Sequence, residues 1–114
     1  MNLKVKSDVV TETFKAAEVE AALRDALISN VQSQAELYGV DLPETLSGVS
    51  KQAVVIDSLV VVEILSVAEP LIGAELPQKL VKEGGYDSVD QAVENLMPKI
   101  EKVWQKKQKG KVAT

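Results

Sequence analysis

Apolar side chains recur at every fourth position early in the chain, and this spacing constrains the fold more than any other feature. The repeat consists of Val19, Leu23, Leu27 and Val31. Because about 3.6 residues make one helical turn, these side chains gather on one face of an α-helix. The spacing predicts a half-buried helix from about Thr13 that ends at Gly39, since glycine readily forms the left-handed turn at a helix C-terminus.

The C-terminal region predicts another long helix. Ser88 and Gln91 match a capping box, in which the two side chains satisfy free backbone donors at a helix start. The apolar stripe behind it consists of Val89, Val93, Leu96, Ile100 and Val103, with Met97 beside it. We expect this helix to reach about Lys109 and to be weakened or bent at Pro98, which lacks a backbone donor. Trp104 extends the stripe, and we interpret it as a packed anchor.

A long connection is predicted between the first helix and the centre of the chain. Residues 40–56 contain Pro43 and Gly48, which break the helical periodicity. Three apolar residues in this stretch need cover, namely Leu42, Leu46 and Val49. Loops of this length without secondary structure of their own are uncommon and often functional.

Residues 57–72 are rich in valine, and by propensity alone they favour a strand. The length of the segment and the good N-cap residue Asp57 favour a helix instead, and we predict a helix. Its expected core side consists of Leu59, Val62, Leu65 or Ser66, and Glu69. Pro70 cannot donate to the carbonyl four residues earlier, so the helix is expected to end or kink near Glu69.

Together these elements predict an all-α fold. Pro77 opens a short third helix, which Gly84-Gly85 stops. We expect one domain over residues 1–114, with loosely ordered ends at 1–12 and 108–114. No apolar run approaches the roughly 20 residues that span a bilayer, and no signal-peptide core follows the start. These features favour a soluble, cytoplasmic protein without a transmembrane segment.

The composition removes several classes of chemistry. The chain contains no cysteine and no histidine, so zinc sites of the Cys/His type are excluded, as are Cys–His and Ser–His–Asp catalysis. No pair of carboxylates stands out at a glycine-rich or strand-end site. A carboxylate, lysine or tyrosine mechanism remains possible on composition alone. An enzyme is the least favoured interpretation, and we predict no catalytic residues and no metal site.

Charge is unevenly distributed along the chain, whose formal net charge is −4. Residues 99–114 carry six lysines and one glutamate, whereas residues 1–98 carry 7 basic and 16 acidic groups. The acidic body disfavours nucleic acid and favours basic protein partners. The basic tail is interpreted as a solvated helix end, with contact to an anionic surface as the alternative.

One set of motifs resembles the acyl carrier protein family. The matching residues are Asp57-Ser58-Leu59, Val62-Glu63, Glu69, Glu75-Leu76-Pro77 and Ser88-Val89. The resemblance covers roughly residues 17–100. It implies a four-helix bundle of the acyl carrier type with a long loop 40–56, a short third helix, and extended first and last helices.

The resemblance also implies a site and partners. Ser58 would be the attachment point of a covalent 4′-phosphopantetheine, and Asp57 would help a phosphopantetheinyl transferase to recognise the chain. The residues implied in partner recognition are Asp57, Leu59, Val62, Glu63 and Glu69. The implied function is to tether acyl groups as thioesters and to deliver them to acyl-transferring or acyl-activating enzymes of fatty-acid, lipid or related biosynthesis.

The sequence departs from the family pattern around this motif. Val55-Ile56 replaces a glycine and a small residue, Val60 replaces an acidic one, and Pro70-Leu71 follows where fatty-acid carriers continue with acids. The helix from Asp57 is therefore apolar almost all round. One interpretation is that an extended first or last helix covers this apolar surface. The other is that the surface binds a dedicated partner protein or supports a weak homodimer.

Alternative functions remain open at this point. A peptidyl or D-alanyl carrier would use the same arm for other cargo, and a helical interaction module would share the scaffold without the prosthetic group. The extended helices resemble those of longer, specialised carriers, including carriers that serve lipid A assembly.

Overall fold

A computed structural model describes the backbone of residues 14–113 and the side chains as far as Gln108. Over these residues the chain is mostly helical and has no strand, in agreement with the predicted all-α class. The helices are α2 (Ala16–Tyr38), α3 (Leu46–Lys51), α4 (Ser58–Ile64), α5 (Glu69–Ile72) and α6 (Val89–Ala113). Two single 3₁₀ turns, Leu65–Val67 and Gln78–Leu80, complete the regular structure. The segment 1–12, predicted to be loosely ordered, lies outside the described residues.

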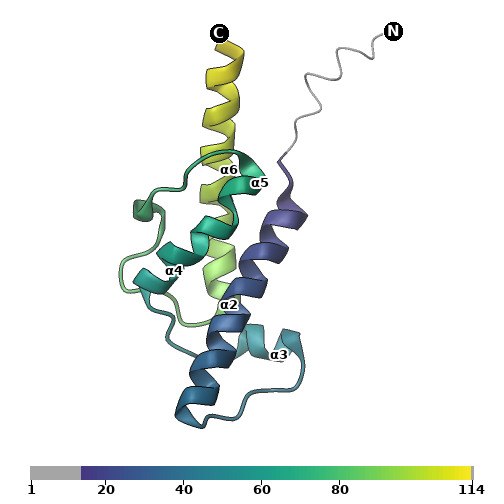
Figure 1. Ribbon diagram of the computed structural model, residues 1–114, viewed down its shortest axis with the longest axis vertical. Helices are drawn as coiled ribbons and strands as arrows, with labels where there is room; N and C mark the ends of the chain where they lie inside the picture. Colours follow the sequence, from purple (N-terminus) through teal and green to yellow (C-terminus); the bar gives the residue numbers. More distant parts are fainter. Residues whose placement is uncertain (1–13, 114) are drawn as a thin grey trace, which may run out of the picture.

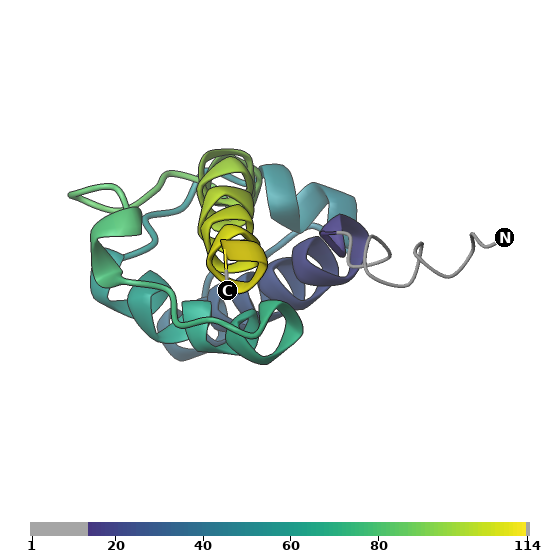
Figure 2. The same ribbon diagram turned by 90° about the horizontal axis from the view of Figure 1, so that it is seen from above.

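The two long helices α2 and α6 form the centre of the fold. Figure 1 shows them side by side, and Figure 2, which looks along α6, shows the other helices arranged around it. The predicted stripes of both helices are buried, except that Val103 is half-buried. The buried members are Val19, Leu23, Leu27, Val31, Val89, Val93, Leu96 and Ile100. The predicted end of α2 is confirmed, because Gly39 adopts a left-handed conformation with φ of 69°.

The structure confirms Leu65 on the core side of the helix from Asp57 and corrects the rest of the predicted core side. The side chains that face the core are Val61, Leu65, Ala68 and Ile72. Leu59, predicted to be buried, is 72% exposed. Apolar residues lie on both sides of this segment, so periodicity alone did not select the buried one. Packing against α2 selects it in the folded chain.

The predicted interruption near Pro70 is confirmed, although it begins earlier. The α-helical geometry of α4 ends at Ile64, the 3₁₀ turn follows, and α5 starts at Glu69 with Pro70 in its first turn. Since Pro70 has no N–H, the carbonyl of Ser66 loses its partner four residues on. The Ser66 hydroxyl donates to the Glu63 carbonyl at 2.8 Å, within the same irregular stretch.

The connection 40–56 is not a plain loop, because it contains α3. Thr45 caps this helix by accepting a hydrogen bond from the Gly48 amide at 3.0 Å. Val49 is buried and Leu42 packs against the core, as expected. Leu46 is 62% exposed, so the expectation that it needs cover is wrong. The short helix predicted from Pro77 is reduced to one 3₁₀ turn.

The predicted cap of α6 forms with one difference. Ser88 Oγ accepts from the Gln91 amide at 3.0 Å, whereas Gln91 Oε1 accepts from the amide of Asp87, one residue before the usual partner, at 2.8 Å. The helix continues through the exposed Pro98, beyond the expected end at Lys109, to Ala113. Of the segment predicted to be loosely ordered, 108–114, the backbone of residues 108–113 is helical, and Thr114 lies outside the described residues.

The chain just before α2 packs on the C-terminal half of α6. The rings of Phe14 and Trp104 lie 5.8 Å apart between centroids and are tilted by 49°. Both side chains are partly buried against the core, which agrees with the packed anchor predicted for Trp104. In Figure 1 the first turn of α2 and the C-terminal half of α6 lie in the upper half of the view, whereas α4 begins in the lower half.

Candidate functional site

Ser58 is the first residue of α4 and is half-buried. Asp57 precedes it in an extended conformation, and its Oδ1 accepts a hydrogen bond from the Leu59 amide at 2.7 Å. The N-cap predicted for Asp57 is therefore present. Because the cap fixes the backbone on both sides of Ser58, the serine is held at a defined point on the edge of the fold.

Backbone hydrogen bonds join the segment before Ser58 to the segment before α6. The Ile56 amide donates to the Tyr86 carbonyl at 2.8 Å, and the Tyr86 amide donates back to Ile56 at 3.0 Å. The Val54 amide donates to the Asp87 carbonyl at 2.9 Å. These bonds fix the entry into α4 from a part of the chain some thirty residues further on.

Gly85 makes this pairing possible. A Cβ atom on Gly85 would lie 2.0 Å from the Ile56 carbonyl oxygen and 3.1 Å from the Ser58 amide nitrogen. Its φ of +82° also disfavours any residue with a side chain. The sequence marked Gly84-Gly85 as a helix stop, and its role beside Ser58 was not predicted.

Tyr86 anchors the same turn to α6. It is only 1% exposed. Its hydroxyl accepts from the Lys82 amide at 3.0 Å and donates to Asn95 Oδ1 at 2.6 Å. Lys99 Nζ donates to the same Asn95 oxygen at 3.0 Å and to the Leu80 carbonyl at 2.9 Å. Burial raises the pKa of the Tyr86 phenol above its ordinary value, while the bond from Lys82 opposes that shift.

The recognition residues implied by the resemblance separate into two groups. Asp57, Leu59 and Glu63 are exposed close to Ser58, and Val62 is half-buried beside them. Glu69 lies eleven residues after Ser58 along the chain and is half-buried. Its Oε2 accepts from the Leu76 amide at 2.8 Å, which ties α5 to the turn that follows it. The structure therefore gives Glu69 an internal contact that the sequence did not indicate.

An apolar groove lies between the C-terminal half of α2 and the segment that leads to Ser58. It has a volume of about 330 Å³. The walls include Val31, Ala35, Tyr38, Val40, Val54 and Val55. Tyr38 and Val55 are 72% and 85% exposed, so the groove opens to solvent. The lining residues with polar side chains are Asn30, Gln34 and Tyr38.

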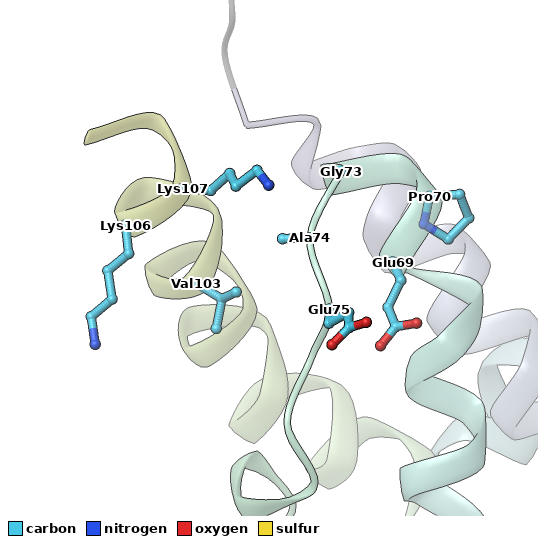
Figure 3. Close-up of a pocket in the computed structure, with 8 residues that line it drawn as sticks. All are labelled: Glu69, Pro70, Gly73, Ala74, Glu75, Val103, Lys106 and Lys107. Atoms are coloured by element: carbon cyan, nitrogen blue, oxygen red, sulfur yellow. The ribbon is translucent and has the colours of Figure 1, made fainter. Parts of the chain in front are cut away.

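A second hollow has a different character and lies toward the other end of the α4–α5 run. Figure 3 shows it between α5 with its following turn and α6. Glu69 and Glu75 supply carboxylates to one wall, while Lys106 and Lys107 come from α6. Because this hollow is wide open and carries both negative and positive side chains, we expect it to hold water rather than to bind an apolar ligand.

Neither a metal cluster nor a membrane-spanning helix is found in the described part of the chain. Its acidic residues do not gather into a group of three or more suited to a metal ion. None of its helices is long and apolar enough to cross a bilayer.

Comparison with protein-family models, with curated proteins and with solved structures finds no match to this chain. The functional argument therefore depends on the site itself. That site presents one hydroxyl at a backbone held by a cap and by cross-chain hydrogen bonds, with exposed acidic and apolar residues beside it.

Proposed function

We propose that this protein is an acyl carrier that bears a 4′-phosphopantetheine arm on Ser58. The observation that carries the proposal is the placement of Ser58, directly after the Asp57 cap and beside the Gly85 turn. An attachment point of this kind needs an accessible hydroxyl on a backbone that does not move when a transferase docks.

The loading step requires little chemistry from the chain itself. Ser58 Oγ would attack the β-phosphorus of coenzyme A and form a new P–O bond. The pyrophosphate bond would break, adenosine 3′,5′-bisphosphate would leave, and the transferase would take the serine proton. The thiol of the arm would then carry acyl groups as thioesters. This division of labour suits a chain that has neither cysteine nor histidine.

The surroundings of Ser58 support docking by other proteins. Leu59 is a large apolar side chain that is 72% exposed next to the serine, and Glu63 is exposed one turn further along α4. An exposed apolar anchor with an acidic neighbour fits a partner whose docking face is apolar and basic. A phosphopantetheinyl transferase and acyl-transferring or acyl-activating enzymes are the partners we propose for this surface.

The proposal also covers the way in which the helices are arranged. The long helices α2 and α6, together with α4 and the short elements after it, would form a carrier-type helical bundle. In this family the third helix is short, and here the single turn Gln78–Leu80 occupies that part of the chain, whereas α5 continues the run that begins with α4. The inserted α3 and the Phe14–Trp104 contact would be additions to that plan.

Intact mass spectrometry tests the proposal. The protein is incubated with coenzyme A and a broad-specificity phosphopantetheinyl transferase, and a gain of one phosphopantetheine is expected. Ser58→Ala should abolish the gain, whereas Ser29→Ala, an exposed serine on α2, should leave it unchanged. No gain with several transferases, including one from the source organism, would favour a helical interaction module instead.

The same phosphopantetheine-loaded protein can be used to identify which class of acyl group it carries. Loaded protein is offered to acyl-activating enzymes for fatty acids, for amino acids and for D-alanine. Acylation by the fatty-acid enzymes supports the proposed carrier, and acylation only by an amino-acid enzyme would replace it with a peptidyl or D-alanyl carrier.

A further inference from the structure

Basic residues are concentrated in the part of α6 that leaves the body of the fold. Among the described side chains of α6, Trp104 is the last apolar one that packs against the core. Figure 1 shows the turns that follow it rising above α5 and the first turn of α2. Residues 105–113 contain four lysines and no acidic residue, whereas residues 1–98 carry 7 basic and 16 acidic groups. The course of α6 therefore carries a cluster of positive charge away from an acidic body.

The lysine side chains described on this part of α6 are free to meet an outside partner. Lys102, Lys106 and Lys107 are exposed. In the described part of the chain every ion pair is formed by Arg24, so these three ammonium groups have no carboxylate within 4.0 Å. Figure 3 shows Lys106 and Lys107 pointing to different sides of the helix. An anionic partner therefore meets positive charge that the chain itself does not neutralise, on more than one side of α6.

The residue types in this stretch favour a fluid anionic surface over a partner with a fixed binding site. All six basic residues of 99–114 are lysines. Their ammonium groups act as point charges, whereas the planar fork of arginine is the group that binds phosphates and bases in fixed geometry. None of residues 105–114 is aromatic, so this stretch offers neither a stacking platform for single-stranded nucleic acid nor an aromatic anchor for a protein partner. Anionic lipid headgroups need no such geometry, because they attract basic segments through the surface potential of the membrane.

We infer that the C-terminal turns of α6 bind the surface of an anionic membrane through their lysines. A helix rises about 1.5 Å per residue, so residues 105–113 add about 14 Å to its length. This exceeds the screening length of about 8 Å at physiological salt. The lysines can therefore touch the headgroups while the acidic body remains screened from them. The inference goes beyond the proposed carrier function and does not depend on Ser58.

Co-sedimentation with vesicles tests the inference on the unmodified full chain. Vesicles of equal parts phosphatidylserine and phosphatidylcholine are compared with vesicles of phosphatidylcholine alone at low ionic strength. The protein should pellet with the anionic vesicles only, and added salt should release it, because salt screens the attraction between exposed charges. Equal binding to both kinds of vesicle, or no binding to the anionic kind, would overturn the inference.

Two double variants with the same change in charge locate the contact. Lys106→Gln/Lys107→Gln should weaken binding by about fivefold for each lysine, the factor expected for one basic residue near an anionic membrane. The matched control, Lys79→Gln/Lys82→Gln, removes two exposed lysines from the body and should bind nearly as tightly as the wild type. All four side chains are exposed, so folding is expected to be unaffected. If both variants lose the same affinity, the total charge governs binding and the inference is wrong.

Other anionic partners give different outcomes in the same preparation. Tighter binding to duplex DNA than to the anionic vesicles at the same salt would assign the lysines to nucleic acid. A salt-sensitive dimer that Lys106→Gln/Lys107→Gln abolishes, without vesicle binding, would assign them to the acidic body of a second copy. Either result overturns the inference. Ser58→Ala should bind vesicles like the wild type, so a failure of phosphopantetheine attachment leaves this inference standing, and a failure of vesicle binding leaves the carrier function standing.

Discussion

Gly85 lies against the backbone of Ser58, so close that a Cβ atom on Gly85 would come within 3.1 Å of the Ser58 amide nitrogen and 2.0 Å of the preceding Ile56 carbonyl oxygen. The two residues belong to different parts of the chain, and only the absence of a side chain lets the 84–86 turn close on the start of α4. The position of Ser58 therefore depends on a glycine far from it in sequence.

Gly85→Ala is expected to destabilise the protein and to disturb Ser58, with Gly84→Ala as the matched control. Both glycines have positive φ, +82° and +90°, so each alanine meets a similar backbone penalty of about 1–2 kcal/mol. Nothing lies within 4 Å of a Cβ on Gly84, whereas the one on Gly85 overlaps backbone atoms. Urea denaturation should show the larger loss for Gly85→Ala, and its phosphopantetheine transfer should be slower. Equal losses would contradict the close contact.

Tyr86→Phe is expected to lower the free energy of unfolding by about 1–3 kcal/mol at neutral pH, because the Lys82 amide and Asn95 lose a buried partner. Since burial raises the pKa of Tyr86 in the folded chain, its stabilising contribution is present below the ordinary phenol pKa of about 10. It is lost as the pH rises through the folded pKa.

Urea midpoints of the wild type and Tyr86→Phe between neutral pH and pH values above 10 test this sign. The difference between the two proteins should shrink as the pH rises, because only the wild type gains an unfolded phenolate at this position. Tyr38 is present in both proteins, so it does not contribute to the difference between them. A difference that grows with pH would contradict the assigned direction.

Glu69→Ala is expected to destabilise the protein by about 1–2 kcal/mol, because the Leu76 amide loses its acceptor. Glu69→Gln keeps a side-chain oxygen in the same place and should recover most of that loss. Thermal unfolding of the two variants separates this internal contact from a role in docking. If the two are equally destabilised, the hydrogen bond to Leu76 contributes little, and the charge of Glu69 matters instead.

Leu59 and Val61 lie on opposite sides of α4, so Leu59→Glu and Val61→Glu should have opposite effects on folding. Leu59 is 72% exposed, so its replacement should leave thermal unfolding nearly unchanged and slow phosphopantetheine transfer, since an apolar docking contact is lost. Val61 is fully buried, and a glutamate there places an unpaired charge in the core and should prevent folding. A Leu59→Glu protein that is modified at the wild-type rate would remove Leu59 from the docking surface.

Several features followed from the sequence because they depend on neighbouring residues. The stripes on α2 and α6, the turn at Gly39, the cap at Asp57 and the interruption at Pro70 each arise from local geometry or from the loss of one backbone donor. Sequence patterns were less reliable where a helix and a loop have similar free energies. The short α3 depends on a single Thr45 cap and on burial of Val49, which the composition of residues 40–56 does not reveal.

The sequence by itself determined that the chain is helical and that a serine stands at the start of a helix. The tertiary structure decided which side of α4 is buried, because both sides are apolar and only contact with α2 distinguishes Val61 from Leu59. It also decided what surrounds Ser58. Gly85, Tyr86 and the groove wall at Val55 meet there through hydrogen bonds and packing between distant segments, and such contacts leave no periodic trace in the sequence.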